Sequence, residues 1–178
     1  MISSRRCSAR RRERDIGQVS ASPDPSGYQA VVSAPGFSLA VRCDDDEIER
    51  IAFLPAGAAV TPGNALAAEA VRQLHAYLAD AGFVFGLPLR PSGTHFQRRV
   101  WQQIAAIPTH QTRTYGELAR ALHNAPRAVG QACGANPFAV VVPCHRVLAS
   151  GGGLGGFARQ NGGFLLDVKR WLLAHEGC

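Results

Sequence analysis

The sequence predicts an α/β protein in two parts: a small N-terminal α/β unit with an antiparallel sheet, and a mainly α-helical C-terminal unit that contains a helix-turn-helix. Three strand-like segments and one amphipathic helix follow one another within residues 26–90, whereas helical spacing of apolar residues dominates residues 91–178. A stretch rich in Pro and Gly, residues 87–93, separates the two. A chain of 178 residues is long enough for two such small units.

The N-terminal segment, residues 1–25, is predicted to be a disordered basic tail, because it is first charge-dense and then rich in Ser, Pro and Gly. The net charge of the chain is +6. Residues 16–90 hold four Arg against eight acids, whereas residues 91–178 hold eight Arg and one Lys against three acids. A basic C-terminal half fits a polyanionic partner such as nucleic acid, or a soluble basic domain without one. The arginines of the tail either contact phosphates or are simply solvated.

Several classes of protein are disfavoured by composition. No stretch approaches the roughly 20 apolar residues that span a bilayer, and no apolar segment follows the Arg-rich N-terminus as in a secretory signal. We therefore expect a cytoplasmic protein with no membrane partner. The five cysteines are widely spaced and include no Cys-x-x-Cys, so neither a disulfide framework nor a metal site is expected. Cys43 and Cys133 are expected to be buried thiols.

The N-terminal unit is predicted element by element. YQAVVSA and FSLAVR, residues 28–34 and 37–42, are typical of two strands joined by a turn, and IERIAFL, residues 48–54, of a third. Asn64 is a suitable cap for the helix that follows. The apolar residues on one face of that helix, which ends near Asp80 and Gly82, are Leu66, Ala70, Leu74 and Leu78.

The C-terminal unit begins with a helix that carries Phe96, Val100, Trp101 and Ile104 and stops before Pro108. Thr114 and Glu117 then fit a capping box for a short helix. After a tight turn at residues 123–125, Pro126 suits the first turn of a second helix that ends at Gly134. Two short helices across a short turn, in a basic segment, resemble a helix-turn-helix.

Arg127 falls in the first turn of the second of these helices. The helix dipole disfavours a cation at that position. This misfit suggests a role for Arg127 outside the helix, although an ordinary surface arginine is the simpler interpretation.

The chemistry is predicted around Cys144. The apolar run of residues 139–142 is predicted to be a buried strand that delivers Cys144 into a loop, a good position for a nucleophile. A thiolate needs a base or a positive neighbour, and His145 is the nearest candidate. Because side chains of adjacent residues point apart, we expect a bridging water or a bend in the backbone between the two.

A histidine base needs an acceptor that orients it, and two acids in the last helix qualify. Asp167 lies in the first turn, where the helix dipole stabilises an anion, so its position needs no further explanation. Glu176 lies at the C-terminal end, where the helix dipole disfavours an anion. Glu176 is therefore the stronger candidate for a Cys/His/acid set.

At this point the residues form a recognisable pattern. VPCHRV, residues 142–147, follows FQRRVW, TYGELA and RAVGQACGANP and precedes WLLAHEG, all in one order. This set resembles the O6-alkylguanine-DNA alkyltransferases, also called methylated-DNA–protein-cysteine methyltransferases. The likeness is close over residues 96–176. Over residues 26–90 it extends only in outline, to the variable RNase H-like N-terminal domain of that family.

The resemblance implies roles position by position. Cys144 would accept the alkyl group, His145 would deprotonate Cys144 through a water, and Glu176 would orient His145. Asn136 would hold the water and the tight turn beside the cysteine. Tyr115 would be the tyrosine whose hydroxyl assists the leaving guanine and crowds the backbone phosphate.

The resemblance also implies a DNA-binding surface and a guanine pocket. Arg127 would fill the base stack after the damaged nucleotide has left it. The other implied DNA contacts are Thr114, Tyr115, Ala128, Gly130 and Arg146. The implied pocket residues are Tyr115, Pro143, Val147, Gly156, Phe157 and Ala158. Phe157 stands where many members carry Tyr, and residues 158–163 are longer than in shorter-loop members.

The function implied is DNA repair by direct reversal. A monomer would flip out O6-alkylguanine in double-stranded DNA, with O4-alkylthymine as a second candidate lesion, and transfer the alkyl group irreversibly to Cys144. One turnover per molecule and no cofactor or metal are expected. Three alternatives stay open: a lesion-binding protein without activity, which the presence of Cys144 disfavours; a cysteine hydrolase, for which no oxyanion hole is marked; and a helix-turn-helix regulator, for which no dimerisation helix is visible.

Overall fold

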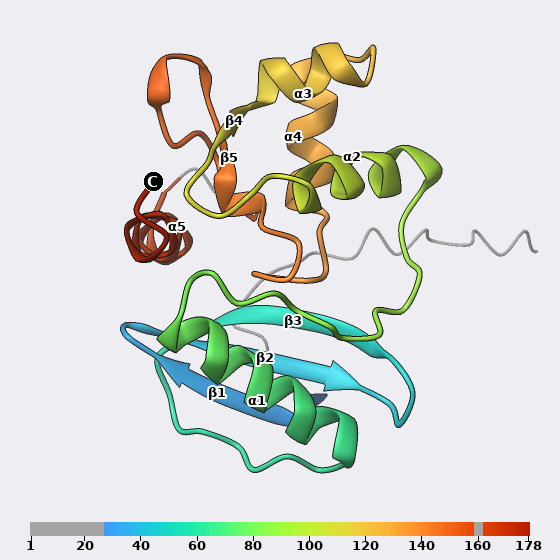
Figure 1. Cartoon of the computed structure of the whole chain (residues 1–178), viewed down its shortest axis with the longest axis vertical. Helices are drawn as coiled ribbons and strands as arrows, with labels where there is room; N and C mark the ends of the chain where they lie inside the picture. Colours follow the sequence, from blue (N-terminus) through green and yellow to red (C-terminus); the bar gives the residue numbers. More distant parts are fainter. Residues whose placement is uncertain (1–26, 159–161) are drawn as a thin grey trace, which may run out of the picture.

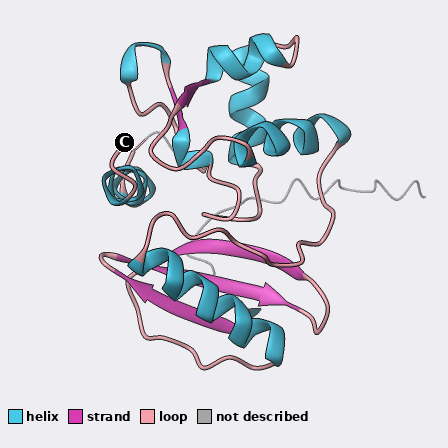
Figure 2. Ribbon diagram, in the orientation of Figure 1, coloured by secondary structure: helices cyan, strands magenta, loops and turns pink. Residues whose placement is uncertain are grey.

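The computed structural model of the chain describes residues 27–158 and 162–178, so the predicted tail lies outside the described residues. The predicted fold class is confirmed: an antiparallel sheet with one helix forms one half, and the helical segments form the other (Figures 1 and 2). The elements are β1 (Ala30–Ala34), β2 (Phe37–Cys43), β3 (Ile48–Pro55), α1 (Ala65–Ala79), α2 (His95–Ala105), β4 (Arg113–Thr114), α3 (Tyr115–Ala121), α4 (Pro126–Gly134), the 3-10 helix η2 (Cys144–Arg146), β5 (Val147–Leu148), the 3-10 helix η3 (Ser150–Gly152) and α5 (Phe164–His175).

The sheet has the strand order β1-β2-β3, and both pairs are antiparallel. Gly36 supplies the positive φ of 86° that the hairpin turn between β1 and β2 requires. Helix α1 lies across one face of this sheet (Figure 1). As predicted, Asn64 caps α1, its side chain accepting a hydrogen bond from the backbone of Ala67.

Residues 87–93, which were expected to separate the two halves, are bound to the sheet through their backbone. The backbone N–H of Ile48, the first residue of β3, donates to Pro88 O (2.7 Å), and the backbone N–H of Arg90 donates to Ile48 O (2.9 Å). The guanidinium of Arg90 forms ion pairs with three acids near the start of β3, namely Asp44, Glu47 and Glu49. Residues 88–90 therefore connect the halves as a short bridge along β3.

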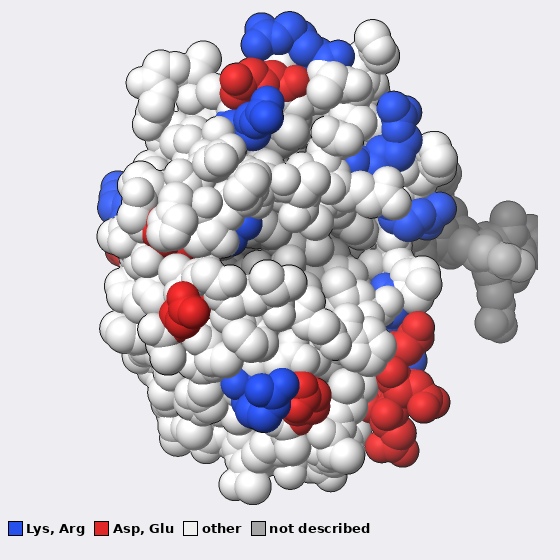
Figure 3. Space-filling model, viewed as in Figure 1, with Lys and Arg blue, Asp and Glu red and all other residues white. Residues whose placement is uncertain are grey.

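The helix-turn-helix is formed as the sequence predicted. Thr114 and Glu117 make the reciprocal hydrogen bonds of a capping box at α3, and Pro126 occupies the first turn of α4. The indole N–H of Trp101 donates to Ala132 O (2.8 Å), which ties α2 to α4. The basic side chains gather over this helical half, whereas an acidic cluster lies over the sheet half (Figure 3).

The predicted strand over residues 139–142 is wrong, because this segment forms a tight turn. Its first residue bonds to β3, where the N–H of Ala139 donates to Ile51 O (3.0 Å), and just before the segment the N–H of Ile51 donates to Pro137 O (2.8 Å). The chain then reverses at Val140, which has a φ of 60°, and the N–H of Val142 donates back to Phe138 O (2.9 Å). The apolar run is buried by this turn instead of by strand pairing.

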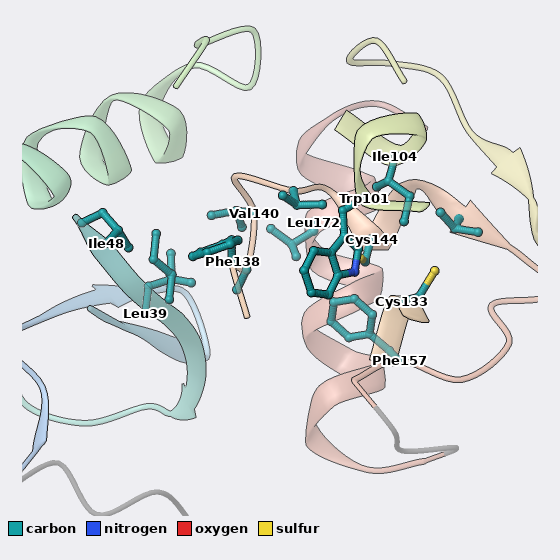
Figure 4. Close-up of a cluster of buried hydrophobic side chains, with 14 of the residues drawn as sticks. Leu39, Ile48, Trp101, Ile104, Cys133, Phe138, Val140, Cys144, Phe157 and Leu172 are labelled. Atoms are coloured by element: carbon teal, nitrogen blue, oxygen red, sulfur yellow. The ribbon is translucent and has the colours of Figure 1, made fainter. Parts of the chain in front are cut away.

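One continuous core joins the two halves. Figure 4 shows Phe138 and Val140 of this turn between Leu39 and Ile48 of the sheet and Trp101 and Leu172 of the helical half. Among the described residues, no helix has the length and apolar character needed to cross a membrane. The turn at residues 138–142 thus packs in the core and leads directly into η2, where Cys144 lies.

Candidate active site

Cys144 is the first residue of η2 and is only 7% exposed. The side-chain N–H of Asn136 donates to Cys144 Sγ (3.2 Å) and to Val142 O (2.9 Å), and its carbonyl oxygen accepts from the N–H of Phe138 (3.0 Å). Asn136 therefore holds the turn and contacts the sulfur with one amide group. Cys144 belongs to the same buried cluster as Trp101, Cys133 and Phe157, which Figure 4 labels.

The surroundings of Cys144 favour its protonated form. A hydrogen bond with the Cys133 thiol and burial raise the pKa of Cys144 well above its usual value, while Asn136 and the charge of Lys169 act in the opposite direction. Since the thiolate is the nucleophilic form, the proton has to be taken by a base when the thiol reacts. The site therefore needs a neighbouring base.

His145 is in the state that a base requires. Its Nε2 lies 2.9 Å from Glu176 Oε1, and because that carboxylate can only accept, Nε2 carries the hydrogen and Nδ1 is left as an acceptor. Burial lowers the pKa of His145, against the opposing effect of Glu176, so the ring is neutral near pH 7. No hydrogen bond joins Cys144 and His145 among the described residues, as expected for adjacent side chains.

Glu176 is the carboxylate of this set. It caps the C-terminus of α5 with no exposed surface. Arg146 donates through Nε to Oε2 (2.7 Å) and through Nη2 to Oε1 (2.8 Å). Although burial opposes it, hydrogen bonds from His145 and Arg146 lower the pKa of Glu176 to about 2. Asp167, the other candidate, is exposed and pairs with Arg170 (2.6 Å), so it is not part of the site.

The expected role of Arg146 in DNA binding needs correction. Its side chain lies inside the protein, where it also donates to Ile107 O (2.5 Å) and Thr109 Oγ1 (3.3 Å). A buried carboxylate needs a buried cation as its partner, and Arg146 serves Glu176 in this way. The charge of a residue in the sequence does not tell whether it faces inward.

Lys169 was missed by the sequence analysis, although it lies close to the site. It is fully buried on α5, and Nζ donates to Val147 O (2.7 Å) and Leu154 O (2.6 Å). Nζ lies 5.9 Å from the ring centre of Tyr115 and 5.6 Å from that of Phe157. Burial lowers the pKa of Lys169 to about 8. A usable signal was its helical spacing from Leu172 and Glu176, which places it on the inner face of α5.

Tyr115 begins α3, and its hydroxyl donates to Gly156 O (3.0 Å). Burial raises the pKa of Tyr115, so the hydroxyl remains a hydrogen-bond donor. Helix α4 passes close to the Tyr115 ring, because a Cβ added to Gly130 would lie 4.0 Å from it. Tyr115 thus lies between α4 and the loop before α5.

A cavity of about 780 Å³ reaches the site from the sheet side. Cys144, His145 and Asn136 line it together with Phe157 and Ala158, two of the predicted pocket residues. The other predicted pocket residues, Tyr115, Pro143, Val147 and Gly156, do not line this cavity, and Pro143 and Val147 are buried. Residues of the sheet half form the opposite wall, among them Tyr28, Arg42, Arg50 and Phe53.

The predicted DNA-binding residues lie on α3 and α4. Arg127 is exposed in the first turn of α4, and Ala128 and Gly130 are half-buried behind it. The hydroxyl of Thr114 is engaged with Glu117 in the capping box. Their contacts with DNA stay predictions. Over residues 27–158 and 162–178, no group of His, Cys, Asp and Glu side chains is arranged to hold a metal ion.

Comparisons with known proteins agree with this geometry. Residues 95–178 match the family model described as 6-O-methylguanine DNA methyltransferase, DNA binding domain. The chain is 37% identical over 158 residues to a methylated-DNA–protein-cysteine methyltransferase of Methanosarcina acetivorans, covering 84% of this chain and 98% of the relative. A relative of the same name from Salmonella typhimurium is 54% identical over 87 residues, 48% of each chain.

Solved structures give the same result. The chain is similar to Mycobacterium tuberculosis O6-methylguanine methyltransferase, with a TM-score of 0.68 and 34% identity over 82% of this chain and 90% of the other. It is equally similar to Mycobacterium tuberculosis OGT in complex with DNA, with a TM-score of 0.68, 36% identity and the same coverage. The similarity therefore includes the sheet half as well as the helical half.

Proposed function

Because the chain belongs to the methylated-DNA–protein-cysteine methyltransferase family, we propose that it repairs DNA by direct reversal, moving the alkyl group from O6 of guanine to Sγ of Cys144. The observation that carries this proposal is a buried thiol beside a neutral histidine whose Nε2 is bonded to a buried carboxylate. This arrangement leaves Nδ1 of His145 as a base for the thiol, and it requires no cofactor.

Duplex DNA is the partner, which the complex of the Mycobacterium tuberculosis relative with DNA supports. The protein acts as a monomer on O6-alkylguanine. The alkyl carbon lies inside the duplex, so the nucleotide has to leave the stack, at a cost of a few kcal/mol. Arg127, exposed at the start of α4, fills the gap.

The transfer is a single displacement. Through one water, His145 Nδ1 takes the proton of Cys144, and the sulfur attacks the alkyl carbon as the bond from that carbon to guanine O6 breaks. The electron pair of that bond stays with guanine. The hydroxyl of Tyr115 turns from Gly156 O to the guanine and donates there, which improves the leaving group. The product is a thioether, which thiol exchange does not reverse, so each molecule acts once.

To test this proposal, the protein is incubated with a duplex oligonucleotide that contains one O6-methylguanine. The intact mass of the protein is then measured, and peptide mapping locates the modified residue. We expect the hydrogen on Sγ of Cys144 to be replaced by a methyl group, and the reaction to stop at one methyl group per protein molecule. Cys144→Ala gains nothing, whereas Cys133→Ala, the neighbouring thiol, still gains one methyl group. Tight binding without transfer would instead assign the protein to the lesion-binding class, and absence of both would exclude a role in DNA repair.

A further inference from the structure

One donor to the catalytic carboxylate comes from the other half of the molecule. The hydroxyl of Tyr77, on α1, donates to Glu176 Oε1 (2.9 Å), and both groups are buried. The same oxygen accepts from His145 Nε2 (2.9 Å) and from Arg146 Nη2 (2.8 Å). Tyr77 therefore donates to the same oxygen atom as His145, although Tyr77 and Glu176 are 99 positions apart along the chain.

The hydroxyl of Tyr77 is held in place from several sides. The side chain is 1% exposed, its ring meets the edge of His175 (5.3 Å between centres) and packs against Phe85 (5.5 Å). Its backbone carbonyl accepts from His175 Nε2 (2.8 Å). Burial and the negative charge of Glu176 raise the pKa of Tyr77, so the hydroxyl stays protonated and donates. The contact is thus built from α1 and α5 together.

We propose that Tyr77 is a positioning residue for the alkyl transfer, acting through Glu176 on His145. This inference rests on the proposed function. A carboxylate offers about four lone-pair sites, and that of Glu176 accepts four hydrogen bonds, three of them at Oε1. The neutral donor Tyr77 takes up part of the negative charge of Oε1 and fixes the rotation of the carboxylate. His145 is consequently kept in the tautomer with a free Nδ1 and remains neutral.

The sign of the effect follows from charge. Without the Tyr77 hydroxyl, more of the negative charge of Glu176 acts on His145, which stabilises the imidazolium and raises the pKa of His145. A larger share of the base is then protonated near neutral pH. Several other titratable or charged groups face the His145–Glu176 pair. They are Arg146 from η2, Lys169 and His175 from α5, His110 from the loop before β4, and Cys178 at the C-terminus. Tyr77 is the member of this set that comes from the sheet half.

Tyr77→Phe tests the proposal, because it removes the hydroxyl and keeps the ring. With saturating O6-methylguanine duplex, the single-turnover rate constant at neutral pH is expected to fall about tenfold, the equivalent of about 1.4 kcal/mol and typical of a lost hydrogen bond to a charged group. The acid limb of the pH–rate profile moves to higher pH. Affinity for the duplex, measured with Cys144→Ala in the background, stays the same.

Phe85→Leu is the matched control, since it disturbs the packing of the Tyr77 ring but leaves the hydroxyl. We expect it to lower the melting temperature without moving the pH–rate profile. An NMR titration of the His145 ring in the free protein adds a measurement that needs no activity: Tyr77→Phe raises the pKa of His145, and Phe85→Leu does not. These results would support the proposal.

An unchanged rate, profile and His145 titration in Tyr77→Phe would overturn the inference, while the proposed function would stand on the activity of the wild type. The same losses in Phe85→Leu and Tyr77→Phe would also overturn it, because the effect would then come from packing alone. A wild type that transfers no methyl group would overturn the proposed function, and the inference with it.

Discussion

At the scale of single residues, the balance of charges around Cys144 decides how readily the thiol reacts. Burial and Cys133 hold the proton on the sulfur, while Asn136 and Lys169 favour the thiolate. Lys169 is the cation of this group, and its own pKa is lowered to about 8 by burial. Its stabilisation of the thiolate is therefore present below about pH 8 and fades as the pH rises above that value.

Replacing Lys169 with Met removes the charge and keeps most of the volume. The pKa of Cys144 is expected to rise, and the rate constant of methyl transfer at pH 7 to fall roughly tenfold, as for one further pKa unit. Alkylation of the thiol by iodoacetamide across pH measures the change. Arg170→Met is the control, because Arg170 is exposed and, among the residues that the structure describes, forms an ion pair with Asp167 alone. Equal thiol pKa values in wild type and Lys169→Met would contradict the expectation.

Sequence reasoning succeeded where a residue's position in a helix was informative. Glu176 was identified because an anion at a helix C-terminus is disfavoured, and the structure explains it by the buried Arg146. Arg146, in contrast, was assigned to DNA contact by the family resemblance, and a basic residue beside a reactive cysteine gives no sign in the sequence that it faces inward. Tyr77 had no signal at all, because its contact joins residues 99 positions apart.

At the scale of elements, the sequence predicts a structural feature well when that feature depends on residues close together in the chain. The capping box of α3 uses Thr114 and Glu117, three residues apart, and the sequence predicted it. The turn at residues 139–142 was wrongly predicted to be a strand, since β-branched residues indicate burial but not which sheet edge is available. The edge of β3 accepts only the beginning of that segment, and the amide of Asn136 then holds the turn.

Thr114→Ala tests the part that the cap plays in the helix-turn-helix. The substitution removes the side-chain acceptor for the N–H of Glu117 and leaves Glu117 with one donor fewer. We expect the free energy of unfolding to fall by about 1 kcal/mol. Chemical denaturation followed by circular dichroism measures this value. Thr112→Ala, an exposed threonine outside the helix, is the control and is expected to change little; equal losses in both variants would show that the cap contributes nothing.

At the scale of the whole molecule, the buried carboxylate of Glu176 also joins the two halves. Glu176 binds Tyr77 of α1 as well as His145 and Arg146 of η2, and the bonds between Ile51 and residues 137–139 form a second connection between the halves. Loss of charge on Glu176 would therefore weaken the site and the contact between the halves together. The stability of the fold should consequently depend on pH in the range where Glu176 titrates.

Two groups, Glu176 and His145, set the direction in which the free energy of unfolding changes with pH. The pKa of Glu176 is about 2 in the folded protein against a usual 4.5, so its contribution is present above about pH 4.5 and is lost as the pH falls through 2. Burial lowers the pKa of His145, so the unfolded chain takes up a proton on this residue at higher pH than the folded protein does. Both groups make the protein less stable in acid.

We therefore expect the free energy of unfolding to fall steadily from pH 7 to pH 3, with Glu176 accounting for on the order of 3 kcal/mol by pH 2. Urea denaturation at several pH values measures it, and both halves should unfold in one transition because they share Glu176 and one core. Asp167→Asn, which removes an exposed carboxylate, should leave the slope against pH unchanged. A free energy of unfolding that stays constant from pH 7 to pH 3, or separate transitions for the two halves, would mean that the buried carboxylate does not couple them.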